Sequence, residues 1–170
     1  METTTAMAEK KGVKKIVVLG AGYAGLRAIL DLAASYRRGA LKAELTLIDR
    51  SPCHQIITWL HLTVTEAVPA HVAYLPLRQL IPTDVVTVMQ ANVEAIAPNT
   101  HTVLTSRGEV RFDRLVVALG SETTVPPIPG LVEHIFPLRW WSDAERLRQH
   151  IRQQFALAGK APSQTERRSR

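Results

Sequence analysis

Apolar residues along the chain alternate between short continuous runs and helical spacings, a pattern that predicts an α/β fold. Residues 16–19 are four consecutive large apolar residues and predict a strand covered on both faces. Beyond three glycines, apolar residues recur at helical spacing from residue 25 to residue 36, and Gly39 is the expected end of that helix. Residues 44–49 predict a second buried strand, which ends in the carboxylate of Asp49. This order of elements favours a parallel sheet covered by helices.

The middle of the chain predicts further strands of two kinds. Residues 85–89 and 114–121 are apolar runs typical of buried strands. Between them, three short segments with alternating polarity predict a small antiparallel β-meander. The meander segments are residues 92–97, 101–105 and 109–112. The pattern is looser over residues 51–82, where prolines exclude a long helix and a short helix is expected over 75–80, entered through Pro76.

The carboxyl-terminal part predicts one long helix. Ser142 and Glu145 have the spacing of a capping box, and apolar residues share one face of the helix that follows. These apolar residues are Ala144, Leu147, Ile151 and Phe155. We therefore expect a flexible tail over residues 1–13, one domain over 14–139, a helix over 140–159 and a disordered tail over 160–170.

Three glycines between the first strand and the first helix predict a dinucleotide site. Gly20, Gly22 and Gly25 have the spacing G-x-G-x-x-G. Gly20 would make the tight turn, Gly22 would let the backbone approach a pyrophosphate, and Gly25 would let the helix pack on the strand. Asp49, at the end of the next strand, is placed to bind ribose hydroxyls. The alternative is a glycine-rich turn that binds nothing.

Composition narrows the class of protein further. The 170 residues have room for one domain, and the net charge of +6 comes from scattered basic residues without a nucleic-acid-binding signature, so we expect no nucleic-acid partner. We find no apolar stretch long enough to cross a bilayer and no signal-peptide pattern, so the expected location is cytoplasmic. Cys53 is the only cysteine, and the histidines His54, His61 and His71 lack metal-ligand spacing, so no metal site is expected.

Several spaced segments resemble the amino-terminal portion of the type II NADH dehydrogenases, flavoproteins with two dinucleotide-binding domains. The segments are residues 18–25, 47–49, 54–55, 76–78, 112–121, 128–130 and 134–138. The resemblance implies a Rossmann-like FAD-binding fold of the glutathione-reductase type, present in part. It also implies a set of FAD-binding residues, and it names no catalytic residue. The implied FAD-binding residues are Gly20, Ala21, Gly22, Tyr23, Ala24, Gly25, Asp49, Arg50, His54, Val93, Ala118 and Gly120.

The resemblance also implies an activity: hydride passes from NADH to FAD, and electrons then pass to a quinone. Relatives continue into an NADH domain and a returning strand, so we expect a truncated or split protein that is inactive alone. The uncovered sheet edge predicts self-association or a complementing chain. The family also implies peripheral association with the cytoplasmic face of a membrane.

Two other readings stay open at this point. One is another FAD-dependent reductase of the same fold, of the sulfide:quinone or ferredoxin type. The single cysteine weakens the sulfide option, because sulfide oxidation requires more than one cysteine. The other reading is a non-catalytic dinucleotide-binding module of a split protein.

Overall fold

The computed structural model describes residues 12–160, which form two compact units. The first unit comprises residues 12–52 and 76–120, and the second comprises residues 53–75 and 121–160. The predicted tails lie outside the described residues, apart from residues 12–13 and residue 160.

A four-stranded parallel sheet forms the centre of the first unit, as the apolar runs predicted. Its strand order is β5-β2-β1-β9. Val18 of β1 pairs with Leu47 of β2 on one side and with Val116 of β9 on the other. The strands are β1 (Lys14–Leu19), β2 (Ala43–Asp49), β5 (Val86–Gln90) and β9 (Arg114–Val117). Helix α1 (Tyr23–Arg37) connects β1 to β2, so the two strands run parallel through a helical crossover.

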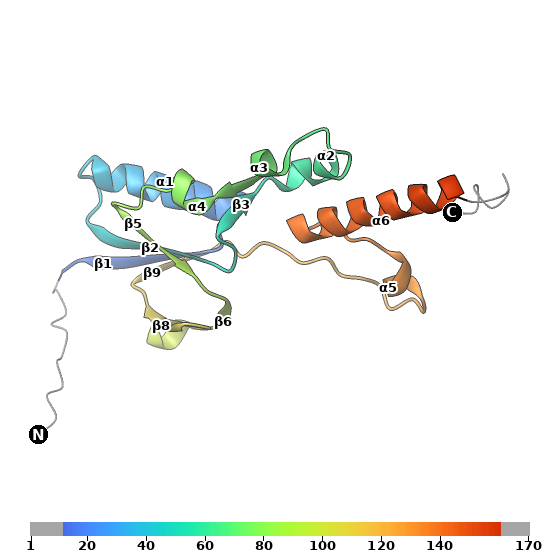
Figure 1. Ribbon diagram of the computed structural model, residues 1–170. Coiled ribbons are helices and arrows are strands. Elements are labelled where there is room, and N and C mark those ends of the chain that lie inside the picture. Colours follow the sequence, from blue (N-terminus) through green and yellow to red (C-terminus); the bar gives the residue numbers. More distant parts are fainter. Residues whose placement is uncertain (1–11, 161–170) are drawn as a thin grey trace, which may run out of the picture. The chain divides into compact units, whose positions relative to one another are not determined.

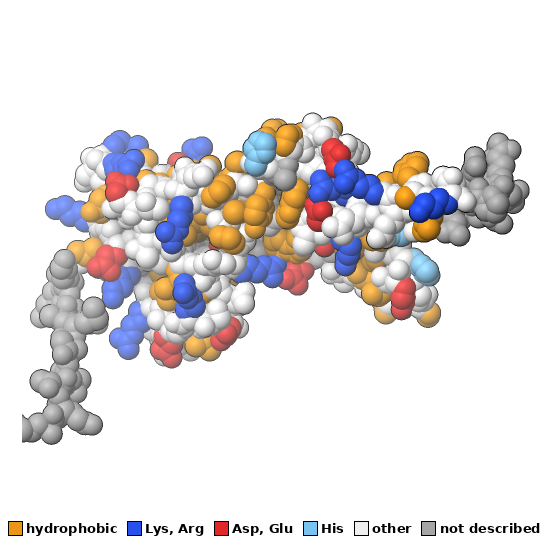
Figure 2. Space-filling model, viewed as in Figure 1, with side chains coloured by type: hydrophobic (Ala, Val, Ile, Leu, Met, Phe, Trp, Pro, Cys, Tyr) orange, Lys and Arg blue, Asp and Glu red, His pale blue; other side chains and the backbone are white. Residues whose placement is uncertain are grey.

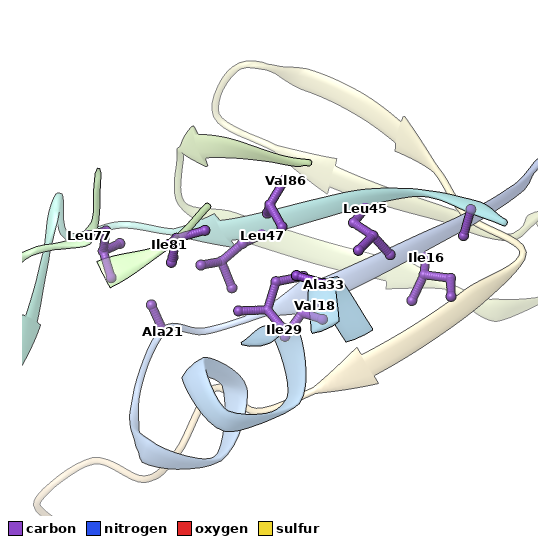
Figure 3. Packing of buried hydrophobic residues seen from close by; sticks show 11 residues of the cluster. Ile16, Val18, Ala21, Ile29, Ala33, Leu45, Leu47, Leu77, Ile81 and Val86 are labelled. Carbon is purple, nitrogen blue, oxygen red and sulfur yellow. The ribbon is translucent and has the colours of Figure 1, made fainter. Parts of the chain in front are cut away.

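Alternate residues of the central strands enter two separate cores, one on each face of the sheet. On one face, Val18 and Leu47 are fully buried with Ile29 of α1, as Figure 3 shows. Helix α4 (Leu77–Leu80) contributes Leu77 to the same core. On the other face, Leu19 and other strand residues pack against the meander. Burial on both faces explains why these strands are almost continuously apolar.

The meander is a separate three-stranded antiparallel sheet, which confirms the predicted mixture of parallel and antiparallel strands. It consists of β6 (Val93–Ala97), β7 (Thr102–Thr105) and β8 (Gly108–Arg111), with the 3₁₀ turn η2 (Pro98–Thr100) between the first two. Val103 of β7 is fully buried in the core that it shares with β1 and β2. Figure 1 shows α1 and the meander on opposite sides of the parallel sheet.

Strand β9 forms one edge of the parallel sheet among the described residues, and β5 forms the other. The amino end of β9 is joined to β1 by Asp113, whose carboxylate accepts a 2.7 Å hydrogen bond from the Lys15 backbone N–H. This hydrogen bond, with the nearby charges of Lys14 and Lys15, holds the pKa of Asp113 below its ordinary value. At the other end, Val117 and Leu119 are 58% and 51% exposed, so apolar surface accompanies the open edge.

The second unit contains short elements and one long helix. Its elements are β3 (Cys53–Gln55), the 3₁₀ helix η1 (Ile57–Trp59), α2 (Leu60–Val64), α3 (Ala70–Ala73), β4 (Tyr74–Pro76), α5 (Leu131–His134) and α6 (Trp141–Lys160). Strands β3 and β4 form a two-stranded sheet. Glu66, after α2, has a positive φ of 62° and pairs with Arg148 and Arg152 of α6. These ion pairs fasten the loop after α2 to the long helix.

The structure changes two details of the predicted helices. The capping box is wrong, because α6 begins at Trp141 and Ser142 therefore lies inside its first turn. Instead, the Asp143 carboxylate accepts hydrogen bonds from the backbone N–H groups of Arg139 and Trp140. The helix expected over 75–80 is confined to α4, since residues 74–76 form β4.

The predicted apolar face of α6 becomes more exposed along the helix. Ala144 is buried, whereas Ile151 is 37% exposed and Phe155 is 76% exposed. The face predicted from periodicity is therefore covered only near its beginning by the described residues. The apolar residues in the later turns of α6 are therefore not covered by the described residues.

Lysine and arginine side chains are spread over the face seen in Figure 2 and are interspersed with acidic side chains. Within residues 12–160, we find no helix with the length and apolar character needed to span a membrane.

Candidate dinucleotide site

The glycine turn after β1 is built by close backbone packing at two of its three glycines. Gly20 has a φ of +94°, and a Cβ placed there would lie 2.3 Å from the carbonyl oxygen of Ala118. A Cβ at Gly25 would lie 1.8 Å from the carbonyl oxygen of Gly20. Both distances are far below van der Waals contact, so these two positions require glycine for folding.

Gly22 differs from the other two glycines, because the protein itself leaves it unconstrained. A Cβ at Gly22 would have no heavy atom within 4 Å among the surrounding residues. Its φ of −68° and ψ of −172° are accessible to any residue. The absence of a side chain therefore opens a space beside the turn that the described residues do not fill. Such a space admits a close approach by a ligand.

Helix α1 begins directly after Gly22 and directs its amino end toward this space. At this end, the Leu26 N–H donates to the Gly22 carbonyl at 2.9 Å. The N–H groups of the first turn come before Leu26 in the chain, and the helix itself contains no carbonyl placed to accept their hydrogen bonds. No acidic residue lies in the first turn. The helix dipole therefore favours an anion such as a pyrophosphate at this end.

Asp49 lies at the carboxyl end of β2, and its carboxylate connects that end to the turn. Its Oδ2 accepts a 2.6 Å hydrogen bond from the Ala21 N–H, and its Oδ1 accepts a 2.7 Å hydrogen bond from the Ser51 N–H. A carboxylate has about four acceptor positions. Two further positions are therefore compatible with the ribose hydroxyls that the sequence assigned to Asp49.

A polar pocket adjoins Asp49 at the carboxyl ends of β2 and β5. The cavity has a volume of about 290 Å³ and is lined by Arg50, Gln90, Ala91, Asn92, Ser106 and Arg107. This volume is at the lower end of the range for small-molecule pockets, roughly 300 Å³. Ligands of parallel α/β sheets bind at this edge, beyond the carboxyl ends of the strands.

The structure brings together most of the residues predicted for the site. Gly20, Gly25 and Ala118 pack against one another, and Ala21 contacts Asp49. Tyr23 and Ala24 form the exposed start of α1, and Arg50 lines the polar pocket. Val93 follows the pocket residue Asn92 and is partly buried in the core beneath the meander. Gly120 closes the first unit with a φ of +75°.

His54 belongs to the second unit, so its contribution to the site stays a prediction. The sequence pattern over residues 51–82 predicts that His54, His61 and His71 lie at the surface or at a pocket edge, but His54 is only 5% exposed. It lies in β3, a strand that the sequence pattern did not predict. His61 and His71 are exposed, as expected.

Sequence reasoning missed the pocket residues beyond Arg50. Gln90, Ala91 and Asn92 follow a predicted buried strand, and the carboxyl ends of neighbouring parallel strands meet at one edge. That signal was available in the sequence. Ser106 and Arg107 carry no such signal, because their approach to this edge depends on how the meander folds back.

Together, the crossover, the glycine turn, the open position at Gly22 and the acid at the end of β2 define a dinucleotide-binding fold of the Rossmann type. Comparison with known families agrees: residues 14–160 match the family described as pyridine nucleotide-disulphide oxidoreductase. The chain belongs to this family. This membership confirms the predicted resemblance to enzymes of the oxidoreductase class.

Curated relatives identify the branch of the family that the chain resembles. It is 36% identical over 143 residues to the type II NADH:quinone oxidoreductase of Staphylococcus saprophyticus, a match that covers 84% of this chain and 35% of the relative. The Staphylococcus aureus enzyme of the same name is 35% identical with the same coverage. The chain thus spans about a third of the length of these relatives.

Solved structures confirm the fold. NDH2 of Plasmodium falciparum has a TM-score of 0.79 at 17% identity, covering 92% of this chain and 32% of that one. The sulfide:quinone oxidoreductase of Aquifex aeolicus has a TM-score of 0.72 at 22% identity, covering 85% of this chain and 33% of that one. These identities establish likeness of fold alone.

Proposed function

We propose that the described residues bind FAD as part of an NADH:quinone oxidoreductase of type II. The observation that carries this proposal is the open position at Gly22, where the protein requires no glycine but a closely approaching ligand would. Membership in the oxidoreductase family and the similarity to type II NADH:quinone oxidoreductases support the choice of FAD.

Each proposed contact has a distinct physical role. The pyrophosphate would lie against Gly22, at the positive end of the α1 dipole. The ribose hydroxyls of the adenosine half would donate to the Asp49 carboxylate, which the Ala21 and Ser51 N–H groups already hold in place. Because these groups are fixed before binding, little ordering cost accompanies the ligand.

We propose the reaction of the curated relatives for a whole protein that contains this segment, and not for the described residues alone. Bound FAD would supply the chemistry, accepting hydride from NADH and releasing electrons to a quinone. The described residues would bind and orient the flavin nucleotide. We assign NADH and quinone binding to other parts of the family fold, whether on the same polypeptide or on a complementing chain.

A flavin titration of the purified chain tests the proposal. FAD fluorescence and the flavin absorption band are followed for the wild-type chain and for Gly22→Val. We expect saturable binding by the wild-type chain and at least a tenfold weaker affinity for the variant, roughly 1.4 kcal/mol, because the valine side chain occupies the space of the pyrophosphate. Thermal melting should show that Gly22→Val is as stable as wild type, since its Cβ meets no protein atom.

Gly159→Val is the matched control. It introduces the same side chain at a glycine of α6 where a Cβ also has no neighbour within 4 Å. This variant should bind FAD as the wild-type chain does. A wild-type chain that binds no FAD, or a Gly22→Val variant that binds it equally well, would contradict the proposed function. Binding of ADP-ribose without any flavin would favour the non-catalytic module instead.

A further inference from the structure

The polar pocket beside Asp49 has a charge pattern that the glycine turn and the acid do not explain. Its lining includes two arginines, Arg50 and Arg107, and no acidic residue is among the residues that line it. The two arginines come from different parts of the fold. Arg50 follows β2, whereas Arg107 lies on the turn between β7 and β8. The meander therefore supplies one wall of a pocket that lies at the carboxyl ends of β2 and β5.

Hydrogen bonds hold this turn of the meander in a defined conformation. The hydroxyl of Thr105, a buried residue, donates to the Gly108 carbonyl at 2.7 Å and accepts from the Arg107 N–H at 3.2 Å. Ser106 is joined to Asn92 twice: its Oγ accepts from the Asn92 N–H, and its own N–H donates to the Asn92 carbonyl, both at 3.0 Å. The backbone at Arg107 is thus held beside the pocket by the protein before a ligand arrives.

The order of strands along the sheet edge indicates what the pocket takes. The glycine turn follows β1, the acid ends β2, and the pocket lies between the ends of β2 and β5, the next strand along. With pyrophosphate at the turn and ribose at Asp49, the next group of an FAD molecule in this direction is the adenine ring. FAD carries no phosphate beyond this ribose, so the base is the group that remains for the pocket.

We propose that Arg107 is a specificity-determining residue of this site, which stacks with Arg50 around the adenine ring of the bound dinucleotide. The proposal rests on the proposed function and extends it to the meander. Guanidinium groups pack favourably on aromatic faces, including those of nucleobases. Gln90 and Asn92 add amide groups to the same lining, which suits the hydrogen-bonding edge of a purine.

The test compares FAD, ADP and inorganic pyrophosphate as ligands of the full chain and of Arg107→Gln. FAD is titrated directly, and the other two compete with it. We expect Arg107→Gln to weaken FAD and ADP by similar factors, about three- to tenfold, as for a lost cation–π contact. Pyrophosphate, which lacks a base, should compete equally well against both proteins. The melting temperature should not change, because Arg107 is exposed.

Arg111→Gln is the matched control, since Arg111 ends β8, is exposed and does not line the pocket. It should leave the affinities for FAD and ADP unchanged. Equal affinity of Arg107→Gln and wild type for ADP would overturn the proposal, as would a similar loss in Arg111→Gln or a matching loss for pyrophosphate. A wild-type chain that binds neither FAD nor ADP would instead contradict the proposed function itself.

Discussion

The carboxylate of Asp49 accepts a 2.6 Å hydrogen bond from the backbone N–H of Ala21 and so ties the end of β2 to the glycine turn after β1. The acid therefore has a structural task in the protein in addition to its proposed contact with ribose. Its second oxygen holds the Ser51 N–H, which belongs to the segment leaving the sheet. One side chain thus orders both loops at this edge.

Replacing Asp49 by alanine should destabilise the chain even without ligand. Two partly buried N–H groups would lose their acceptor, which costs about 1–3 kcal/mol in the free energy of unfolding. Urea denaturation of the ligand-free chain measures this loss. Asp31→Ala is the control, because the exposed Arg27–Asp31 pair should contribute about 0.5 kcal/mol or less. Equal stability of the two variants would show that Asp49 does not order the turn.

Gly25→Ala should behave unlike an ordinary helical glycine substitution. Alanine normally stabilises a helix relative to glycine by roughly 0.5–1 kcal/mol. At Gly25 the added Cβ would lie 1.8 Å from the Gly20 carbonyl oxygen, so the helix must move away from the sheet. We expect a loss of about 3 kcal/mol or more. Gly159→Ala, in open space on α6, should be neutral or stabilising in the same urea experiment.

The backbone hydrogen bond that Asp113 accepts from Lys15, together with its ion pair with Lys14, predicts a pH dependence with a definite sign. Its pKa is lowered in the folded chain, chiefly by the Lys15 N–H, from an ordinary value of 3.8. The folded state therefore binds fewer protons than the unfolded state in that range, and stability rises with pH. The stabilisation by the Asp113 carboxylate is complete at pH values above its ordinary pKa of 3.8, and it is lost as the pH falls through the lowered pKa of the folded chain.

Thermal melting of wild type and Asp113→Asn, followed from neutral to acidic pH, checks this sign. The wild-type chain should be the more stable at neutral pH, and the difference should shrink once the pH falls below the ordinary value of 3.8. A difference that stays constant over the whole range would mean that the Asp113 charge is not responsible.

The exposed apolar edge at β9 predicts self-association of the purified chain. An open strand with apolar side chains can pair with another chain, and a lysine on such an edge opposes pairing. Val117→Lys should therefore shift sedimentation velocity profiles toward monomer. Val132→Lys introduces the same charge at a valine that is 67% exposed on α5, outside the sheet, and should not. A wild-type chain that stays monomeric at high concentration would refute the prediction.

The sequence pattern predicted the part of the fold in which each element has its own signal. Runs such as residues 16–19 are buried on both faces, and Gly20 and Gly25 occupy positions that admit no side chain. The position of Asp49 could be predicted because it directly follows the apolar run of the second strand. For these residues, local chemistry and tertiary position coincide.

Features that depend on distant segments could not be predicted in the same way. His54 is buried in β3, which pairs with β4 about twenty residues further along the chain, and the three residues of β3 are too few for a periodic signal. Ser142 has a capping sequence, but Asp143 supplies the acceptor at the helix start instead. Arg107 reaches the pocket through the return of the meander, which periodicity does not specify.

The three glycines of the motif are needed for two different reasons, one that concerns folding and one that concerns the proposed ligand. Gly20 and Gly25 leave no room for a side chain, whereas the open space at Gly22 would be used only by the proposed ligand. A descendant that ceased to use the cofactor would keep the outer glycines and could accumulate any small residue at the middle one. The middle glycine is therefore a position at which loss of the proposed FAD binding would leave a trace in the sequence.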